Sequence, residues 1–303
     1  MKTIVITSIY SPQIATLKYA NIPGWNVVVV GDMKTPDEEY DSLKNITYLS
    51  PDNQKKLYPE LSELIGWNSI DRRNIGYAYA YKMGASVIAS VDDDNIPLEN
   101  WGKNLYIDKP IECKLYTTNN CPVFDPLSVT TYNHLWHRGF PIYWLKEKNN
   151  ISYENKKIIP SFQANFWNGD PDIDAIARLE HYPNCDFSKD NIFPFSSSIL
   201  SPFNSQNTFI SRNAIKDYFC FPFIGRMDDI WGAYYALSKG HKVIYDEATV
   251  YQDRNIHDNI IDFENEIIGY KNSHKLVLDI DNIQNYIPER SWRSFLEYQK
   301  LFN

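Results

Sequence analysis

Four candidate strands in the first 95 residues constrain the fold of this chain most strongly. All but the third are unbroken apolar runs, which are typical of parallel strands covered on both faces. Residues 69–85 carry apolar side chains at helical spacing and end near Gly84, a residue type that commonly terminates helices. The alternation of strands and helix predicts a nucleotide-binding βαβ half. The four runs are 2–10 (KTIVITSIY), 24–32 (GWNVVVVGD), 45–50 (NITYLS) and 85–94 (ASVIASVDDD).

The remaining two thirds of the chain show weaker periodicity. Residues 100–200 are rich in Asn, Pro and aromatic residues, and they predict long loops with short strands. A helix is predicted at 226–241 and one or two late strands at 242–253, and from about residue 260 onward the pattern is helical and polar. We therefore predict one compact α/β domain with a helical C-terminal extension.

Charge and composition exclude several kinds of partner. The 303 residues carry a formal net charge of −8 and include no run of five basic residues, so we expect no nucleic-acid partner. The N-terminal apolar stretch is too short for a signal segment, and no stretch reaches the roughly 20 apolar residues of a membrane span. We therefore predict a cytoplasmic protein without a membrane span. The aromatic fraction of 15% favours sugar ligands, whose apolar faces pack on aromatic rings.

Three consecutive carboxylates, Asp92, Asp93 and Asp94, end the fourth run. Crowded like charges are costly to bury, but open α/β sheets bind ligands at the carboxyl ends of their strands. Mg²⁺ or Mn²⁺ would neutralise the cluster, because both ions prefer hard oxygen ligands. Asp92 and Asp94 point the same way in an extended chain, and Asp93 points the opposite way. We predict Asp92 and Asp94 as a DxD pair for a metal and a diphosphate, with Asp93 nearer a ribose; the alternative is an acidic turn.

A second acidic pair, Asp228 and Asp229, lies near the start of the predicted helix at 226–241. Acidic residues stabilise helix N-termini, so capping is one interpretation. The other interpretation is chemical, because these carboxylates could bind acceptor hydroxyl groups or act as a base.

Three arginines and one histidine are further candidates. Arg72 and Arg73 begin the helix before the acid triplet, where guanidinium groups are suited to hold a diphosphate. Arg138 is a further basic candidate, and His257, after the late strands, is a candidate metal ligand. A solvated surface position is the alternative for each of them. The chain contains no GxxxxGK[ST], GxGxxG, HExxH or GxSxG motif, which removes the main support for P-loop, dinucleotide, zinc-protease and hydrolase functions.

Several long blocks of the chain resemble the STELLO-type glycosyltransferase family. They occur in the same order as in that family and span about residues 3–260, with a weaker match near the C-terminus. STELLO proteins are longer, membrane-anchored Golgi proteins, and because we expect no anchor here, their cellular role is not transferred to this chain. The blocks are WNVVVVGDMKTP (25–36), WNSIDRRNIGYAYAYKMGASVIASVDDDN (67–95), LWHRGFPI (135–142), NGDPDIDAIARL (168–179), SPFNSQNTFI (201–210), RMDDIWGAYYA (226–236) and SWRSF (291–295).

The chain is more distantly similar to the reversibly glycosylated polypeptides, which include UDP-arabinopyranose mutases. The acid triplet and the segments 139–141, 172–175 and 226–231 match that family. Both resemblances imply a GT-A fold, a UDP-sugar donor and a divalent cation. In the mutases an arginine shortly after the Gly-Phe-Pro segment becomes glycosylated, whereas the nearest residue here is Lys146, offset by one position. This departure argues against self-glycosylation and mutase activity.

These observations predict a GT-A-like, mostly parallel Rossmann-like sheet with helices on both faces at 1–260, and a helical extension at 261–303 packed on it. The predicted function is metal-dependent transfer from a nucleotide-sugar donor, with a mutase and a non-catalytic nucleotide-sugar-binding protein as alternatives. The amide side chains of Asn204, Gln206 and Asn207 could bind sugar hydroxyl groups, and hydrogen bonding to the loop backbone is the alternative role. The predicted site residues are Thr7, Ser8, Asp32, Arg72, Arg73 and Asp93 for the nucleotide; Arg138, Asp172, Asp174, Asn204, Gln206 and Asn207 for the sugar or acceptor; Asp228 and Asp229 for catalysis; and Asp92, Asp94 and His257 for Mn²⁺ or Mg²⁺.

Overall fold

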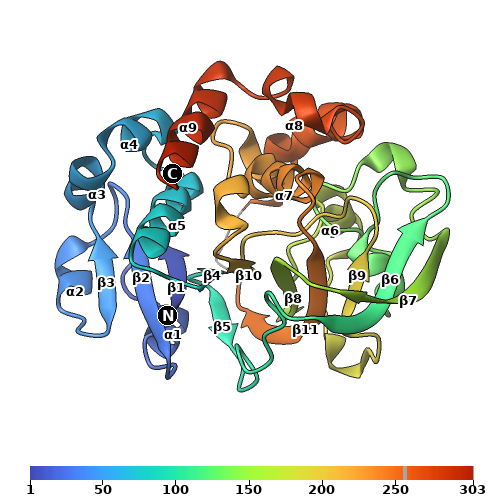
Figure 1. The fold of residues 1–303 in the computed structure, drawn as a ribbon, viewed down its shortest axis with the longest axis horizontal. Helices are drawn as coiled ribbons and strands as arrows, with labels where there is room; N and C mark the ends of the chain where they lie inside the picture. Colours follow the sequence, from blue (N-terminus) through green and yellow to red (C-terminus); the bar gives the residue numbers. More distant parts are fainter. Residues whose placement is uncertain (255–257, 303) are drawn as a thin grey trace.

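A computed structural model describes residues 1–254 and 258–302. In these ranges eleven strands form one mixed sheet flanked by helices (Figure 1). The strand order is β3-β2-β1-β4-β10-β8-β11-β9-β6-β7, and β5 pairs with β11. The strands are β1 (Lys2–Thr7), β2 (Trp25–Val30), β3 (Ile46–Leu49), β4 (Val87–Asp92), β5 (Asn95–Pro97), β6 (Ile111–Thr118), β7 (Ile151–Ile158), β8 (Phe162–Gly169), β9 (Phe195–Ser197), β10 (Asn207–Ser211) and β11 (Val243–Gln252).

The helices follow the strands along most of the chain. The α-helices are α1 (Ile14–Tyr19), α2 (Asp37–Asp41), α3 (Pro51–Leu57), α4 (Pro59–Ile65), α5 (Arg73–Lys82), α6 (Ala175–His181), α7 (Asp228–Ser238), α8 (Asn259–Leu276) and α9 (Glu289–Lys300). The 3₁₀ turns are η1 (Ile70–Arg72), η2 (Pro126–Val129), η3 (Ile142–Trp144), η4 (Phe187–Lys189), η5 (Ile215–Asp217), η6 (Gly225–Met227) and η7 (Ile280–Asn285).

Strands β1 to β4 form a parallel block at one end of the sheet. The central strand β1 pairs in parallel with β2 and β4, and β2 pairs in parallel with β3. Thr7, at the end of β1, lies opposite both Val30 and Asp92, so the carboxyl ends of three strands meet at one edge. All of β1 except its first residue is buried, as expected of unbroken apolar runs covered on both faces. The predicted α/β class with a Rossmann-like sheet is confirmed.

Helix α5 packs closely on this parallel part. Gly76 makes the approach possible, because a Cβ atom at this position would lie 2.4 Å from the Cγ1 atom of Val5 and 2.8 Å from the Cγ2 atom of Val30. The chain leaves the helix at Gly84, which has φ of +84°, a conformation that glycine adopts without steric cost. Helix α5 therefore carries its N-terminal arginine, Arg73, to the edge where β1 and β4 end.

The strand direction reverses at β10. This strand is antiparallel to both β4 and β8, whereas β11 runs parallel to β8. In β11 the register with β8 shifts between Asp246 and Val250, which bends a long strand. Where one or two late strands were predicted at 242–253, the structure has this single irregular strand.

The region 100–200 contains more strand than its sequence predicted. Strands β6, β7 and β8 each span eight residues. Strand β7 lies at the end of the sheet and is mostly exposed, so its side chains are polar and lack an apolar period. Strand β8 is almost fully buried but includes Gln163 and Asn165, which hydrogen-bond to each other at 3.0 Å. Buried polar pairs of this kind hide a strand from a hydrophobicity pattern.

The C-terminal residues form helices that pack on distant parts of the chain. Helix α8 begins where Asp258 accepts a hydrogen bond from the backbone N–H of Ile260 at 2.8 Å, and it contacts α6 and η6. Helix α9 contacts α4, and the ring of Phe302 packs on Tyr81 of α5. The boundary at 260 between a catalytic domain and an extension stays a prediction.

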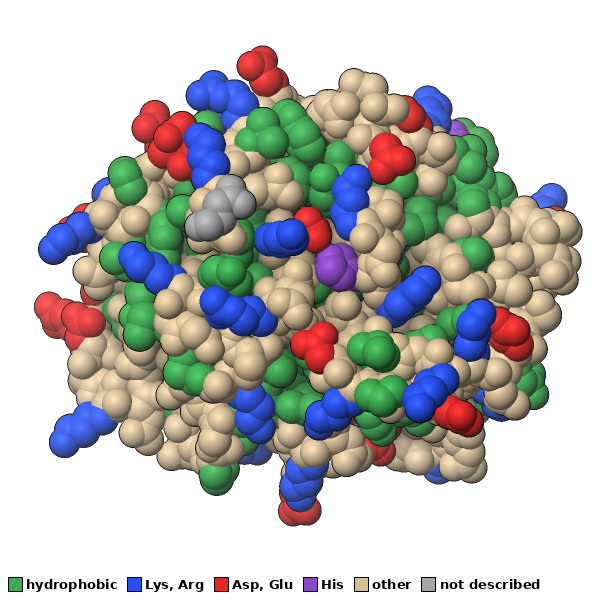
Figure 2. All heavy atoms as spheres, viewed as in Figure 1, with side chains coloured by type: hydrophobic (Ala, Val, Ile, Leu, Met, Phe, Trp, Pro, Cys, Tyr) green, Lys and Arg blue, Asp and Glu red, His purple; other side chains and the backbone are tan. Residues whose placement is uncertain are grey.

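Charged side chains are spread over the surface. On the face shown in Figure 2, Lys and Arg side chains lie among Asp and Glu side chains, with apolar groups between them. Within 1–254 and 258–302, no helix has the length and apolar character that crossing a bilayer requires.

The packing of α7 gives a first prediction. A Cβ atom at Gly232 would lie 2.1 Å from the carbonyl oxygen of Phe219, and a backbone atom cannot move aside cheaply. We expect Gly232→Ala to lower the free energy of unfolding by about 1–3 kcal/mol through overpacking, although alanine alone would favour a helix by about 1 kcal/mol. Urea unfolding monitored by circular dichroism measures the sign of the change, and a more stable variant would contradict this packing.

Candidate functional site

Two neighbouring cavities lie at the carboxyl ends of the parallel strands, and Ile70 lines both. The first has a volume of about 300 Å³ and the second about 320 Å³. Residues of the first cavity include Thr7, Ser8, Tyr10, Asp32, Lys34, Ser69 and Asp93. Residues of the second include Arg73, Asp92, Asp94, Arg138, Asp172, Gln206, Arg226, Asp228, Asp229, Arg254 and Asp262.

The acid triplet is divided between the two cavities. Asp93 lines the first, and Asp92 and Asp94 line the second. The hydroxyl of Ser8 donates to Asp93 Oδ2 at 2.5 Å, and Arg73 Nη2 lies 2.5 Å from Asp92 Oδ1. Burial, and to a lesser extent the charge of Asp92, raises the pKa of Asp93 to about 6. The like charges therefore have different surroundings, although they are consecutive in the chain.

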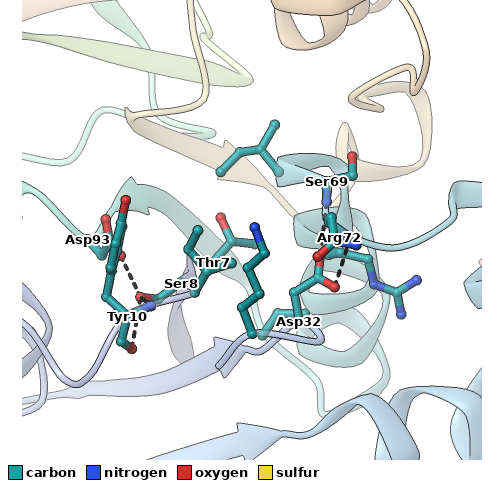
Figure 3. A pocket seen from close by; sticks show the side chains of 12 residues that line it. Thr7, Ser8, Tyr10, Asp32, Ser69, Arg72 and Asp93 are labelled. Atoms are coloured by element: carbon teal, nitrogen blue, oxygen red, sulfur yellow. Dashed lines mark hydrogen bonds between the residues drawn. The ribbon is translucent and has the colours of Figure 1, made fainter. Parts of the chain in front are cut away.

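Asp32 organises one wall of the first cavity. Its carboxylate accepts hydrogen bonds from the backbone N–H groups of Met33, Asn68 and Ser69 at 2.7 to 3.0 Å. Figure 3 shows Asp32 and Ser69 on one side of the cavity and Ser8 and Asp93 on the other. Asp32 thus fixes the loop after α4 against the end of β2.

Arg72 and Arg73, adjacent in sequence, have different environments. Arg72 is among the residues that line the first cavity (Figure 3). Its guanidinium stacks on the Trp67 ring and donates to Gln54 Oε1 and to the carbonyl oxygens of Ser62 and Gly66. Arg73 donates to the Ser205 carbonyl oxygen at 2.8 Å and contacts Asp92 in the second cavity. The predicted diphosphate role therefore has little support for Arg72, whose N–H groups are already used.

A buried ion network forms much of the second cavity. Arg138 donates to Asp172 Oδ2 at 2.9 and 2.7 Å and to Asp229 Oδ1 at 2.9 Å. Arg226 Nη2 donates to Asp172 Oδ1 at 2.7 Å, and Arg254 lies 3.9 Å from the same oxygen. Burial acts to raise the pKa of Asp172, but these three guanidinium groups hold it well below its usual range.

The predicted catalytic pair contains two different carboxyl groups. Asp229 Oδ2 accepts from the backbone N–H and the hydroxyl of Ser205 at 2.8 and 2.9 Å, and Arg138 occupies the other oxygen. Burial acts to raise the pKa of Asp229, but Arg138 and these hydrogen bonds lower it. Asp228 is 3.8 Å from Arg138, and burial together with the charges of Asp229 and Asp71 raises its pKa well above the usual range. Asp228 is therefore the member of the pair that holds a proton more readily.

Only part of the predicted sugar-binding set lines a cavity. Gln206 lines the second cavity, and Asn204 lies behind the cavity wall, donating to Asp172 Oδ2 at 3.2 Å. Asn207 donates to the backbone of Phe166 at 3.0 Å and accepts from the Trp101 indole, which is the alternative, structural role. Asp174 is completely buried as the N-cap of α6, where it accepts from the N–H of Ile176 at 2.9 Å.

The described residues offer a partial coordination set for a cation. In 1–254 and 258–302, no group of three or more His, Cys, Asp or Glu side chains is arranged to hold a metal ion. His257 lies outside the described residues. The second cavity nevertheless has six aspartates and four arginines. Its carboxylates thus outnumber the guanidinium groups.

Sequence patterns missed several residues of the site. Arg226 and Arg254 complete the ion network, and Lys34 lines the first cavity with an exposed side chain. Lys34 follows β2 by four residues, so the rule that ligands bind after parallel strands could have found it. A further missed residue is Asp71 in η1, next to the two arginines; nothing in its local pattern distinguishes it from a helix-capping acid.

Comparisons with known proteins agree with the resemblance of the sequence blocks. No protein-family model matches the chain. "Probable glycosyltransferase STELLO2" and "Probable glycosyltransferase STELLO1" of Arabidopsis thaliana are each 26% identical over 233 residues, which cover 70% of this chain. The match covers 30% of each relative, so the chain spans less than a third of the curated relatives it matches.

Among solved structures, the crystal structure of M. tuberculosis glucosyl-3-phosphoglycerate synthase covers 91% of this chain and 81% of its own, with 10% identity and a TM-score of 0.44. This value is too low to support an argument about function. The sequence comparison is the informative one, and it makes the chain a distant relative of the STELLO-type family.

Proposed function

We propose that this chain is a glycosyltransferase that takes a sugar from a nucleotide-sugar donor with the help of a divalent cation. The observation that carries the proposal is the division of the acid triplet between two cavities at the carboxyl ends of parallel strands. A nucleotide sugar has two parts of different chemistry joined by a diphosphate. The two cavities match these parts, and Asp92 to Asp94 lie where they meet.

The first cavity suits the nucleoside. Thr7, Ser8 and Asp32 lie at the ends of β1 and β2, and Asp93 and Tyr10 complete the wall. Hydroxyl and carboxylate groups can bind the ribose, and the partly exposed Tyr10 ring offers a face for a base. Lys34 adds a positive charge for the phosphates. We propose a UDP-sugar as the donor, because the sequence blocks resemble families that use one.

The residues present fit a cation whose coordination shell is completed by phosphate oxygens of the substrate. Magnesium-type ions are commonly held by one or two carboxylates together with substrate phosphates and water. Asp92 and Asp94 would hold the ion, and the surplus of carboxylates in the second cavity favours a positive partner. When bound, the ion would supply charge neutralisation for the leaving diphosphate.

The second cavity suits the sugar and the reacting groups. Gln206 and the fixed carboxylate of Asp172 can orient hydroxyl groups of the sugar, while Arg73 neutralises Asp92 from the other side. We assign Asp228 as the group that receives the proton of the acceptor hydroxyl, because Asp229 is committed to Arg138 and Ser205. Asp229 and Arg138 then act by keeping the wall of the cavity in place.

The mutase alternative lacks the group on which the resemblance depends. Lys146 is exposed after η3 and lines neither cavity. A non-catalytic binding protein would not require Asp228 to carry a perturbed carboxyl group within the second cavity. These observations favour transfer over the two alternatives.

Binding of the donor is the first test. A ligand at 100 times its Kd stabilises the native state by about 2.7 kcal/mol, which corresponds to about 5 °C in Tm for a chain of this size. We expect a UDP-sugar with Mn²⁺ to give such a shift, and Asp94→Asn to abolish the part that depends on Mn²⁺. Differential scanning fluorimetry over a panel of nucleotide sugars measures it.

Asp52→Asn is the matched control, because the Asp52 side chain is 95% exposed and lines neither cavity. The control should keep the full shift. Equal shifts for Asp94→Asn and the control, with and without Mn²⁺, would remove the assigned role of the triplet.

Product analysis separates transfer from mutase activity. Incubated with the donor alone, the protein should release UDP slowly by transfer to water and should form no isomeric UDP-sugar. Anion-exchange chromatography resolves the two products. A new UDP-sugar peak without any acceptor would establish the mutase alternative instead.

A further inference from the structure

The carboxyl group of Asp71 lies next to Asp228, although no sequence pattern marked it. Asp71 is 6% exposed and belongs to η1, just before α5. The hydroxyl of Ser69 donates to Asp71 Oδ2 at 2.5 Å. On the other side, the side chain of Asp71 is within hydrogen-bonding reach of the side chain of Asp228. Two acids from distant parts of the chain are therefore in contact at the edge of the second cavity.

A contact between two carboxyl groups is favourable when the pair holds one proton. Asp71 Oδ1 is buried and has no N–H or hydroxyl donor, and a buried oxygen without a hydrogen bond is unfavourable. A proton on Asp228 would supply the missing donor, whereas two ionised carboxylates would repel each other. Burial raises the pKa of Asp71 to about 6 and the pKa of Asp228 well above its usual range. The direction of both changes agrees with one proton held between the two groups.

The surroundings of the pair are mixed in charge. Arg73 of α5 and Arg138 favour ionised carboxyl groups, while Asp229 favours protonated ones. The thiol of Cys220 also faces the pair, and burial raises its pKa, so it is neutral near pH 7. The Ser69 hydroxyl favours ionisation of Asp71, because it stabilises a negative charge on that carboxyl group.

The same serine connects the pair to the first cavity. The backbone N–H of Ser69 donates to Asp32 Oδ2 at 3.0 Å while its hydroxyl donates to Asp71. Figure 3 shows Ser69 and Asp32 in contact at the wall of this cavity. A chain of polar contacts therefore runs from the nucleotide cavity through Ser69 and Asp71 to Asp228.

We propose that Asp71 is a positioning residue that shares one proton with Asp228 and accepts this proton when Asp228 takes up the proton of the acceptor hydroxyl. The inference rests on the proposed function. In the step, the acceptor oxygen bonds to the anomeric carbon, and the bond from that carbon to the diphosphate oxygen breaks with its electron pair. The hydroxyl proton passes to one oxygen of Asp228, and the proton held on the other oxygen passes to Asp71.

The pH dependence of turnover tests this relay. Transfer requires ionised Asp71, so kcat should fall about tenfold per pH unit below about pH 6. Asp71→Asn should lower kcat about 100-fold, the lower end of general acid–base effects, remove the acidic limb and leave the KM of the donor nearly unchanged. The readout is UDP release, with water as the acceptor, from the UDP-sugar that stabilises the protein best.

Ser69→Ala is a milder variant that keeps both carboxyl groups. The Ser69 hydroxyl lowers the pKa of Asp71, so its removal should move the acidic limb to higher pH. Asp52→Asn, an exposed acid, should leave the profile unchanged. An unaltered acidic limb in both Asp71→Asn and Ser69→Ala would overturn the relay.

A spectroscopic measurement keeps this inference separate from the proposed function. Infrared difference spectroscopy between the wild type and Asp228→Asn resolves the C=O stretch of a protonated carboxylic acid. The band of the buried acid Asp174 is present in both proteins and cancels in the difference. We expect this band in the wild type at pH 7 and its shift in Asp71→Asn. If the band is present but no UDP is released, the proton shared by Asp71 and Asp228 is supported and the proposed glycosyltransferase function is contradicted. If UDP is released but the band is absent, only the shared proton is overturned.

Discussion

The ion pairs of Arg138 with Asp172 and Asp229 hold the second cavity together. Arg138 comes from the segment between η2 and η3, Asp172 follows β8, and Asp229 lies in the first turn of α7. All three are at least nine-tenths buried. Removal of one partner from such a network leaves an uncompensated charge and costs about 3–5 kcal/mol. Three segments that carry the candidate reacting groups therefore depend on one guanidinium group.

The same network explains why neighbouring acids differ in chemistry. Arg138 lowers the pKa of Asp229, while Asp228, one residue earlier, lies 3.8 Å from that arginine and contacts Asp71. Neighbouring acids of the triplet also have different partners, because Ser8 contacts Asp93 and Arg73 contacts Asp92. In both clusters separate partners relieve part of the repulsion between like charges.

Apolar patterning predicted the parallel half well, because β1 to β4 are covered on both faces and leave little room for polar residues. It failed for β7, whose side chains face solvent, and for β8, where the buried polar side chains of Gln163 and Asn165 form hydrogen bonds inside the protein. It also gave no helix for 51–65, although Ser50 accepts from the N–H of Asn53 as an N-cap before Pro51. Capping and edge position are local or tertiary effects that hydrophobic periodicity does not report.

For the candidate site, residue type and strand ends predicted the place but not the roles. The alternation of side chains along a strand was enough to expect Asp92 and Asp94 on one side and Asp93 on the other, and this is where the cavities lie. Folding alone decided that Arg72 binds the loops around α4 while Arg73 contacts Asp92, and that Asp174 caps a helix. Folding also brought Asp71 to Asp228. The reason is physical: local geometry follows from the bonds between neighbours, whereas burial, ion pairing and proton sharing depend on residues that only the folded chain brings into contact.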